Sequence, residues 1–450
     1  MTEKEVVDIL SQDGTEIVLT YAPAGLGHLR DMDALKDGIP KGVRSSILTS
    51  DDESIRLIHR LTSVNPLMRR IFEFMQSGRP QTVFTYFYRI FLRANVREVR
   101  EQLQLFIKNK KPKRLIIVTT HFGFAHQVAA VKKELEKETG CKIYLIVQAT
   151  DDSPQYIWYV DGADLEFVTS GYVKNGLAEY GRQRHLPTIN MEINPTPLHP
   201  FLLMPLTSKE MINKKTQADA KSEVPINVVV PISGAAVGTH YIFDLMKKLH
   251  QKSDRFQFQV ITKIAPYTKK FLRDLKGKDY IKVYASNKDK EVVDLYHQVI
   301  KTNVILLEIT KPSEQAFKAA LEPGTRGGVI MLFTTPVGRQ EYENVDYLVR
   351  RDLMPPEAEN KKMWAIALHQ EKCPTDIPRL DAAIRIPDDP EEASEFIRCC
   401  LDKGLFAKML LSSRKAKKEK YPDEINGEGV KMFWEKTAKF LVSETDDHHY

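Results

Sequence analysis

Cysteines and long apolar runs are scarce in this chain, and both absences narrow the class of protein. Only 4 of the 450 residues are cysteine, two of them adjacent (Cys399, Cys400), and none forms a CxxC pair. This usage indicates the reduced thiols of a cytosolic protein and excludes a small disulfide scaffold. No stretch of about 18 uncharged apolar residues occurs, so we expect no segment that spans a bilayer. The acidic start, MTEKEVVDIL, differs from a secretory signal, and we expect none.

Acidic residues are scarce between residues 55 and 114, although the whole chain is nearly balanced. It has 66 Lys and Arg against 60 Asp and Glu, a net charge of +6. Residues 55–114 hold 14 of these basic residues and only 3 acidic ones, so the rest of the chain is slightly acidic. This local excess points to an anionic partner for one part of the molecule. With 42% hydrophobic residues and about 100–200 residues per domain, the chain can form two or three folded domains.

Short runs of β-branched and aliphatic residues recur in the first half, each followed by a helical pattern. They occur at residues 16–22, 114–120, 142–150 and 165–170. Because the runs are almost continuously apolar and alternate with helices, they favour a parallel, doubly wound sheet. The pattern returns after a proline-rich stretch, with runs at 226–233, 256–264, 280–285, 303–310 and 327–335. We therefore expect an α/β protein with two Rossmann-like domains.

These patterns divide the chain into four parts. We expect an N-terminal domain at residues 1–200, which carries the basic stretch 55–113 as an amphipathic insertion, and a linker at 201–225. The second domain is expected at 226–385. Residues 386–450 should form C-terminal helices, the last of which crosses back to the first domain. Within them, the lysine-rich segment 414–420 is expected to be a solvated helix face.

The turn after the first strand contains two glycines and a histidine, Gly25, Gly27 and His28. Glycines let backbone N–H groups approach a ligand, and the following helix N-terminus favours an anion. The spacing differs from the dinucleotide-binding G-x-G-x-x-G, because Arg30 stands at the third glycine position. His28 is therefore a candidate site residue or, alternatively, a histidine that makes a local hydrogen bond.

Polar residues also follow the next two strands, at the sheet edge where ligands bind in open parallel sheets. His121 and His126 come after the run at 114–120. Histidines five apart do not share a helix face, so we expect no metal site and expect one of the two to be structural. Asp151 and Asp152 follow the run at 142–150 and have two interpretations. They orient a sugar hydroxyl or a base, or they make ordinary turn and N-cap contacts.

The second half repeats this arrangement of polar residues after strands. A glycine-containing turn follows the run at 226–233, and helices are expected after the runs at 303–310 and 327–335. The first of these begins near Pro312 and Ser313, with Pro and Glu in its first turn, as helix N-termini favour. The candidate residues in these segments are Gly234, Gly238, Thr239, Ser313, Glu314, Gln340, Glu341 and Asn344.

In the basic stretch, bulky apolar residues are interleaved with arginines, as at Phe87, Tyr88, Arg89, Phe91 and Arg93. A cationic amphipathic helix of this kind lies in an anionic membrane interface, which these five residues would contact. Two alternatives stay open. The helix packs on its own domain with solvated arginines, or its arginines and aromatic rings bind nucleic acid.

Taken together, residues 15–350 resemble a GT-B glycosyltransferase. The closest resemblance is to the monogalactosyldiacylglycerol synthase group and to a related cell-wall transferase that adds N-acetylglucosamine to a lipid-linked precursor. The turn before His28 loosely matches the family's G-G-G-H, and His121 and His126 keep its five-residue interval. Further matches are Thr150-Asp151, Trp158 and Asp164, and the G-Q-E-x-x-N motif at Gly338, Gln340, Glu341 and Asn344 with Arg339 inserted.

The resemblance implies two Rossmann-like domains that face each other across a cleft. It implies His28 as general base on the acceptor hydroxyl, a role that the near-neutral pKa of histidine suits, and Asp151 as an orienting group or alternative base. It implies a nucleotide-sugar donor, in first place a UDP-sugar, and no cofactor or metal. The donor-binding residues that it implies are Gly234, Gly238, Thr239, Ser313, Glu314, Gln340, Glu341 and Asn344. The residues on the acceptor side are Gly25, Gly27, His121 and His126.

The leading hypothesis is therefore a glycosyltransferase with a membrane-lipid acceptor, and three alternatives stay open. They are a catalytically inactive scaffold that binds a nucleotide sugar or a partner, a nucleotide-sugar epimerase, and a transferase with a soluble acceptor. The segment Lys311-Pro312-Ser313-Glu314 lacks the glycines that the family places before its ribose-binding acid, which favours the scaffold. We expect a cytoplasmic protein, peripheral on the inner face of the cell membrane, that binds an anionic membrane surface and no nucleic acid.

Overall fold

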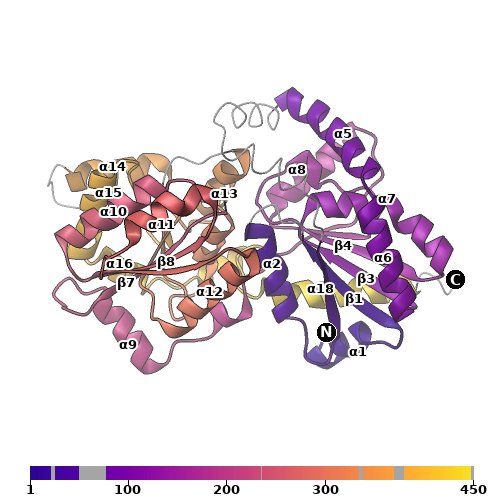
Figure 1. Ribbon diagram of the computed structural model, residues 1–450, viewed down its shortest axis with the longest axis horizontal. Helices are drawn as coiled ribbons and strands as arrows, with labels where there is room; N and C mark the ends of the chain where they lie inside the picture. Colours follow the sequence, from indigo (N-terminus) through magenta and orange to yellow (C-terminus); the bar gives the residue numbers. More distant parts are fainter. Residues whose placement is uncertain (22–25, 50–77, 235, 334–337, 369–379, 447–450) are drawn as a thin grey trace. The chain divides into compact units, whose positions relative to one another are not determined.

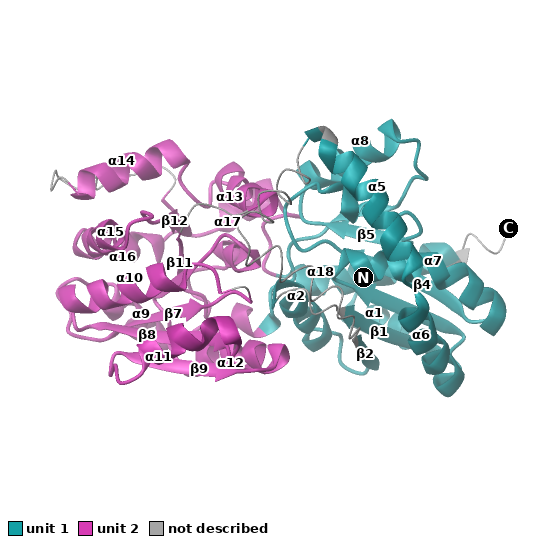
Figure 2. Ribbon diagram, turned by 45° about the horizontal axis from the view of Figure 1, so that its top comes forward, with its two compact units in different colours: residues 1–200, 428–450 teal, residues 201–427 magenta. Residues whose placement is uncertain are grey.

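The computed structural model describes residues 1–21, 26–49, 78–234, 236–333, 338–368 and 380–446, which belong to two units (Figures 1 and 2). Unit 1 comprises Met1–Pro200 and Glu428–Tyr450, and unit 2 comprises Phe201–Gly427. The predicted site residue Gly25 and the first part of the predicted basic insertion, 55–77, lie outside the described residues.

Unit 1 is built on a six-stranded parallel sheet of order β2-β1-β3-β4-β5-β6. Its central strands are buried along almost their whole length, as expected for a sheet covered on both faces. The strand order reverses between β1 and β3, which are paired through Thr20 and Thr119. The strands are β1 (Thr15–Tyr21), β2 (Ser45–Thr49), β3 (Arg114–Thr119), β4 (Lys142–Gln148), β5 (Leu165–Val168) and β6 (Met191–Ile193).

Most helices of unit 1 follow a strand in the sequence, the first helix precedes the first strand, and the last helix comes from the C-terminal end of the chain. Local signals set their ends: His121 caps the N-terminus of α7, and Gly140, with φ 68°, ends it in the left-handed conformation. The helices are α1 (Glu3–Leu10), α2 (Leu26–Asp37), α5 (Gly78–Ala94), α6 (Arg97–Lys110), α7 (Phe122–Thr139), the 3-10 turn η1 (Tyr156–Trp158), α8 (Gly171–Gln183) and α18 (Gly429–Asp446).

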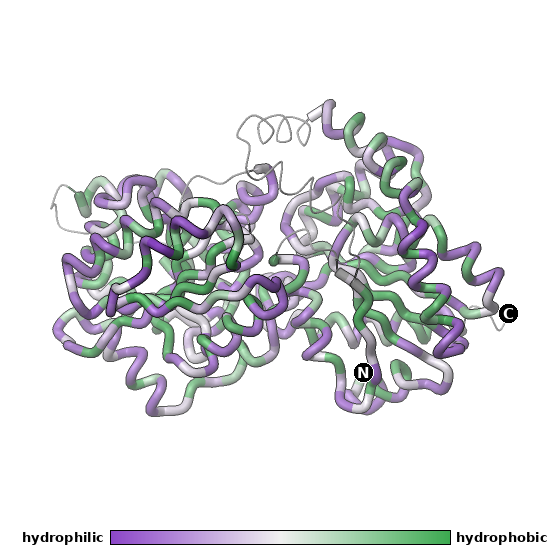
Figure 3. Tube along the Cα trace, viewed as in Figure 1, coloured by the Kyte–Doolittle hydropathy of each residue, from purple (hydrophilic) through white to green (hydrophobic). Residues whose placement is uncertain are grey.

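Unit 2 is built on a second six-stranded parallel sheet, of order β12-β11-β10-β7-β8-β9. This is the doubly wound Rossmann order, and it reverses between β7 and β10. The strands are β7 (Ile226–Pro231), β8 (Phe256–Lys263), β9 (Ile281–Ser286), β10 (Leu307–Thr310), β11 (Val329–Leu332) and β12 (Ala383–Arg385). Figure 3 shows the strands of both sheets as predominantly hydrophobic. The predicted α/β class with two Rossmann-like domains is confirmed.

In unit 2, α10, α14 and α15 pack together, and α12 packs on β8 and β9. The helices are η2 (Pro200–Leu203), α9 (Ser208–Gln217), α10 (Thr239–Lys252), η3 (Pro266–Thr268), α11 (Lys269–Leu275), α12 (Asp289–Thr302), η4 (Glu314–Ala320), α13 (Arg339–Arg350), α14 (Glu357–Leu368), α15 (Pro390–Asp402), α16 (Leu405–Met409) and α17 (Lys415–Lys420). None of the described helices of either unit is long and apolar enough to cross a membrane.

The segment 201–225, expected to be a linker, is part of unit 2. It contains α9, whose N-terminus is fixed by a capping box between Thr207 and Glu210. Lys214 and Gln217, on the inner face of this helix, are buried. The prediction of a linker was wrong for this part of the segment, because its polar residues form a helix that packs on unit 2.

Candidate active site

A histidine marks the point in unit 1 where the strand order reverses. Ligands of open parallel sheets bind outside the carboxyl ends of the strands at such a point. His28 lies in the first turn of α2, after β1, next to the half-buried Gly27. Thr120 and His121 follow β3, the neighbouring strand. The sheet topology thus brings together two segments that are about ninety residues apart in the sequence.

Two hydrogen bonds join these segments and set the orientation of the His28 ring. Its Nδ1 lies 2.7 Å from the carbonyl oxygen of Thr120, and the Thr120 hydroxyl donates to the carbonyl oxygen of His28 at 2.8 Å. Because a carbonyl oxygen can only accept, Nδ1 carries the proton of the neutral ring and Nε2 carries the lone pair. Nε2 is therefore the basic atom of the neutral ring.

The predicted acid Asp151 is joined to His28 through a threonine. The hydroxyl oxygen of Thr150 lies 3.3 Å from His28 Nδ1 and 3.5 Å from Asp151 Oδ2. Thr150 is buried, whereas Asp151 is half-buried. Its neighbour Asp152 is fully buried and accepts a hydrogen bond from the Thr169 hydroxyl at 2.8 Å. Asp152 therefore fits the alternative in which an aspartate of this pair makes structural contacts. The two aspartates therefore have different surroundings.

Of the two predicted acceptor-side histidines, only His121 lies beside His28. Their ring centroids are 4.8 Å apart at an interplanar angle of 83°, and His121 Nδ1 also accepts the backbone N–H of Gly123 at 3.1 Å. The assignment of His126 to the acceptor side is corrected, because its side chain is fully buried. Its Nε2 donates to the carbonyl oxygen of Ile157 at 2.9 Å, and burial lowers its pKa to about 3. His126 is a neutral structural residue beneath η1.

Aromatic rings surround His28 in unit 1. The Trp158 ring lies 6.2 Å and the Phe122 ring 6.4 Å from the His28 ring, measured between centroids. Trp158 and Phe122 are themselves in edge contact at 5.4 Å. Trp158 is buried at the end of η1, and Phe122, the first residue of α7, is half-buried. The polar atoms of His28 and Thr150 thus lie beside a mostly apolar wall.

Helix α5, from the predicted basic insertion, has a buried and an exposed face. The buried face follows helical spacing and carries Gln81, Thr85, Arg89 and Leu92. The opposite side, called here the exposed apolar face, carries Val83, Tyr86, Phe87, Ile90 and Phe91, which are each at least 42% exposed. Large apolar side chains that are grouped on a surface in this way indicate an interaction site.

The arginines of α5 fasten the helix to its own domain. Arg89 and Arg93 both donate to the carboxylate of Asp161, which follows η1. Burial alone would raise the pKa of Asp161, but the two guanidinium groups outweigh it and hold that pKa below its ordinary value. The membrane-contact assignment of Arg89 is corrected, because its side chain is only 9% exposed.

The remaining predicted membrane contacts divide between the two sides of α5. Phe87 and Phe91 belong to the exposed apolar face. Tyr88 is half-buried and meets Phe122 edge-on at 6.2 Å. One face of α5 packs on its own domain, as one of the alternatives predicted. That alternative also expected solvated arginines, whereas Arg89 and Arg93 are bound to Asp161.

In unit 2, the predicted glycine turn lies after β7, where that strand order reverses. Gly234 accepts a hydrogen bond from the Tyr267 hydroxyl at 2.7 Å through its carbonyl oxygen. Gly238 has φ 79°, and a Cβ there would come within 2.6 Å of the Phe333 ring, so only glycine fits. Thr239 begins α10 directly after it. The turn therefore presents backbone groups and a helix N-terminus at one place.

The predicted donor residues after β10 and β11 are in contact with each other. Glu341 is buried in the first turn of α13 and forms an ion pair with Lys311. The Asn344 side chain, also buried, donates to the carbonyl oxygen of Pro312 at 3.4 Å. These contacts hold the start of α13 against the segment that leads into η4. Ser313, Glu314 and Gln340 lie on the same two segments and are half-buried.

A buried charged group beneath η4 was not foreseen from the sequence. Lys318 and Glu308 form an ion pair with almost no exposed surface, and the Tyr296 hydroxyl binds both. No sequence pattern predicts this pair, because Lys318 lies in a 3-10 helix and Glu308 lies within an apolar strand. This group holds η4 onto β10, and so it supports the segment that carries Ser313 and Glu314.

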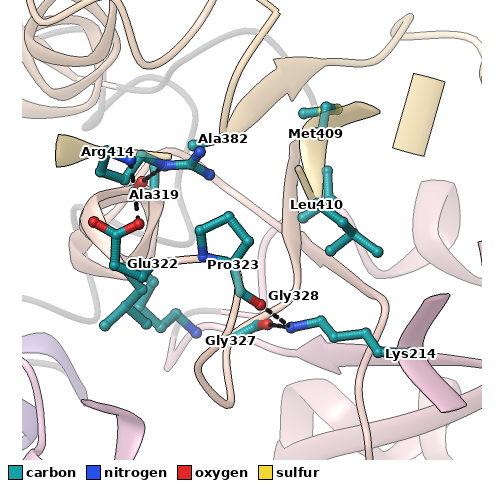
Figure 4. Close-up of a pocket in the computed structure, with 13 residues that line it drawn as sticks. Lys214, Ala319, Glu322, Pro323, Gly327, Gly328, Ala382, Met409, Leu410 and Arg414 are labelled. Atoms are coloured by element: carbon teal, nitrogen blue, oxygen red, sulfur yellow. Dashed lines mark hydrogen bonds between the residues drawn. The ribbon is translucent and has the colours of Figure 1, made fainter. Parts of the chain in front are cut away.

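A pocket in unit 2, of about 300 Å³ including solvent-open space, is lined by Lys318 and by two further buried basic side chains (Figure 4). Lys214 donates to the carbonyl oxygens of Pro323, Thr325 and Gly327, and burial lowers its pKa to about 7. Arg414 is buried and bonded to Asp381. The expectation of a solvated face at 414–420 is therefore corrected at its first residue. The basic side chains of this pocket bind carbonyl and carboxylate groups of the protein itself.

No protein-family model matches the chain, and no curated protein matches it in sequence. Several solved structures align over most of its length. The MnaA–UDP co-structure of S. aureus aligns with a TM-score of 0.48 at 10% identity, over 93% of this chain and 94% of that chain. UDP-GlcNAc 2-epimerase from Neisseria meningitidis, bound to UDP-GlcNAc, gives 0.47 at 10%, over 94% and 99%. A UDP-glucosyltransferase from Polygonum tinctorium capable of glucosylating indoxyl gives 0.46 at 11%, over 95% and 98%.

Proposed function

We propose that this protein is a GT-B glycosyltransferase that transfers a sugar from a nucleotide-sugar donor, in first place a UDP-sugar, to a hydroxyl of a membrane lipid. The observation that carries the proposal is the orientation of His28, whose Nδ1 lies 2.7 Å from a backbone carbonyl oxygen. Its Nε2 is consequently the basic atom, at the sheet edge where ligands bind. The resemblance of the surrounding motifs to lipid-modifying glycosyltransferases supports the same reaction.

In the proposed reaction, His28 Nε2 takes the proton of the acceptor hydroxyl while its oxygen attacks the anomeric carbon of the donor sugar. The bond from that carbon to the diphosphate oxygen breaks, and the nucleoside diphosphate leaves with the bonding electrons. The imidazolium that forms keeps its Nδ1–H bond to Thr120. The charge of Asp151, linked through Thr150, stabilises this imidazolium.

Unit 2 would bind the donor where its own strand order reverses. The backbone at Gly234 and Gly238 and the N-terminus of α10 suit the diphosphate, because N–H groups there point toward an anion. The resemblance implies that Glu314 contacts the ribose and that Gln340 and Glu341 contact the donor sugar. Of the latter two we propose Gln340 alone for this contact, because Glu341 is buried and paired with Lys311. The proposed base belongs to unit 1, and the proposed donor residues belong to unit 2.

The lipid acceptor is proposed because of the exposed apolar face of α5. A helix with such a face lies in a membrane interface with its apolar side chains among the acyl chains. Because Arg89 and Arg93 are bound to Asp161, we expect α5 to bind the membrane through burial of its apolar side chains more than through its charge. The proposed place of action is accordingly the surface of a membrane, at the inner face of the cell membrane.

The transfer proposal is tested by incubating the purified protein with UDP-glucose, UDP-galactose or UDP-N-acetylglucosamine and vesicles that contain diacylglycerol. Mass spectrometry of the lipid fraction should detect a glycolipid with at least one donor. His28→Ala should lower its rate of formation by about 100-fold or more, because general base catalysis contributes 10²–10⁴-fold. The matched control is His185→Asn, an exposed histidine whose φ of 50° asparagine tolerates.

Each other outcome selects a different function. Release of nucleoside diphosphate only with a water-soluble acceptor would replace the lipid by that acceptor. Conversion of the nucleotide sugar into an epimer would identify an epimerase. Nucleotide-sugar binding by calorimetry without turnover would identify a scaffold. A transfer rate that His28→Ala leaves unchanged would remove His28 as the base.

The membrane proposal is tested by co-sedimentation with vesicles of phosphatidylglycerol and phosphatidylcholine. Phe87→Ser should lower vesicle binding by about tenfold or more, because an exposed phenylalanine loses its transfer into the acyl region. The control is Leu105→Ser, an equally exposed apolar residue on α6. Equal binding of both variants and the unchanged protein would rule out α5 as the contact.

A further inference from the structure

Strand β9 forms one edge of the sheet in unit 2, at the end opposite β12 (Figure 2). It pairs with β8 on one side, and no described strand lies on its other side. The backbone N–H of Ile264 donates to the carbonyl oxygen of Ser286, so the even-numbered residues of β9 bond to β8. Because the direction of hydrogen bonding alternates along a strand, the backbone groups of Val283 and Ala285 point away from β8. These two residues therefore offer donors and acceptors to a further strand.

Basic side chains are concentrated on β9 and on α11, the helix that leads from β8 to β9. Residues 263–290 contain nine Lys and Arg but only three Asp. Three of the lysines form ion pairs with acids of α12, as Lys263 does with Asp289. The other six basic residues form no ion pair with a described residue, and all but Lys278 are exposed. We call them the basic edge: Lys269, Lys270, Arg273, Lys276, Lys278 and Lys282.

The charge of the basic edge decides which kind of strand can pair with β9. A lysine on an edge strand commonly keeps sheets from pairing with one another. Lys282 does so against a second copy of this chain, because two β9 strands side by side would bring their lysines together. The six cations are offset only by Asp274 and Asp279, which form no ion pair with a described residue. The edge therefore disfavours a basic strand and attracts an acidic one.

We propose that unit 2 binds an extended, acidic segment of a partner protein as an added strand on the outer edge of β9. The backbone of the segment would bond to Val283 and Ala285, and its carboxylates would pair with the basic edge. Its apolar side chains would cover Val283 and Ile264, which are 37% and 46% exposed. A membrane surface or a nucleic acid is also anionic, but neither presents the regular row of donors and acceptors that a strand edge needs. This contact uses none of the residues proposed for sugar transfer.

The test is fluorescence anisotropy of the full-length protein with a labelled octapeptide in which glutamate and valine alternate. One control peptide has lysine in place of glutamate. The other has proline in place of valine, which keeps the charge but cannot pair as a strand. We expect the alternating acidic peptide to bind at low salt and both controls to bind at least about tenfold more weakly.

Two variants separate the added strand from simple charge attraction. Val283→Pro should weaken binding of the acidic peptide by about tenfold, because it removes an edge N–H that β8 does not use, and edge strands tolerate proline. Lys282→Glu should weaken it by about tenfold as well, because attraction becomes repulsion. The matched control is Lys362→Glu on α14, an exposed lysine of a helix that packs on β12, and it should leave the affinity unchanged. The melting temperature of every variant reports whether unit 2 is folded.

Three results would overturn the proposal. The first is no binding of the acidic peptide at low salt. The second is equal affinity for the valine and proline peptides, or binding that Val283→Pro leaves unchanged, since either would show charge attraction without an added strand. The third is sedimentation with phosphatidylglycerol vesicles that Lys282→Glu abolishes and Val283→Pro does not, without peptide binding, which would identify a membrane contact instead.

Discussion

Burial acts in opposite directions on two ionisable side chains behind the candidate active site. It raises the pKa of Glu166 to about 8 and lowers that of His126 to about 3, because each group loses the water that stabilises its charged form. Both side chains are therefore neutral at pH 7. Glu166 accepts the backbone N–H of Val160 at 3.3 Å, and His126 donates to the carbonyl oxygen of Ile157. Together they support the segment that places Trp158 beside His28.

The neutral Glu166 makes the stability of unit 1 depend on pH. Since its folded pKa is about 8 and its unfolded pKa 4.5, the folded state keeps a proton that the unfolded state loses between these values. Stability should therefore fall as pH rises from about 4.5 to 8, by about 3 kcal/mol at pH 7. Glu166→Gln should remove this loss, so that its melting temperature exceeds that of the unchanged protein at pH 8 but not at pH 4.5.

Calorimetric melting at the two pH values checks this expectation. The matched control is Glu192→Gln, a half-buried glutamate on the neighbouring strand β6. Equal pH dependence of the Glu166→Gln variant and the unchanged protein would show that Glu166 is ionised inside the fold.

At the scale of the element, α5 shows why composition alone misassigned some residues. Its sequence mixes aromatic residues and arginines, and the amphipathic pattern correctly predicted a helix there. The pattern could not indicate that Asp161, far along the chain, would bind Arg89 and Arg93. The arginines consequently lie toward the domain, and apolar residues that usually face a core are exposed.

The attachment of α5 gives a prediction about stability. Arg89→Ala should destabilise unit 1 by about 3 kcal/mol, because it leaves the partly buried Asp161 with one guanidinium partner fewer. Arg97→Ala on α6 should have no measurable effect, because its ion pair with Glu101 is exposed to solvent. Urea unfolding followed by the fluorescence of tryptophans checks both variants. A smaller loss of unfolding free energy for Arg89→Ala than for Arg97→Ala would show that the bonds of Arg89 and Arg93 to Asp161 do not hold α5 in place.

At the scale of the whole molecule, the chain returns to its first unit after completing the second. The last helix, α18, packs in unit 1 on α1 and α2. Its Trp434 donates to the carbonyl oxygen of Leu35 at 3.0 Å, and Phe433 lies 4.8 Å from Phe167, between ring centroids. Unit 1 is therefore assembled from both ends of the chain.

This arrangement predicts unequal effects of truncation. Removing residues 428–450 should lower the melting temperature of unit 1 strongly, because two fully buried aromatic side chains, about 2–3 kcal/mol each, leave its core. The transition of unit 2 should keep its temperature, and residues 201–427 should fold alone. Differential scanning calorimetry separates the two transitions, with the exposed Lys439→Ala as the control. A single transition that shifts as a whole would contradict the independence of the units.

In the folded molecule, acidic residues of unit 1 balance part of the charge of the basic stretch. The basic stretch in the sequence contains arginines that bind acids elsewhere in unit 1, such as Arg89 with Asp161 and Arg100 with Glu138. Part of the local positive charge is thus neutralised by the fold. In the described part of the stretch, acidic residues of unit 1 therefore already balance charges for which the sequence predicted an anionic partner.

The sequence by itself determined the class of fold and the segments that carry chemistry. Apolar runs and helical patterns are local properties, so they predict the parallel strands of two Rossmann-like units without knowledge of their partners. The resemblance of the motifs pointed to His28 and Asp151 for the same reason, since each motif lies on a few neighbouring residues.

Only the tertiary structure decided how these segments act together. The Nδ1 atom of His28 bonds a carbonyl that is 92 residues away and lies beside a threonine 122 residues away, and no local pattern encodes such contacts. The same holds for the burial of His126, for the clamp on Asp161 and for the ion pair of Glu341. Side-chain roles depend on solvent exclusion and on partners from other strands, which exist only after the sheet has formed.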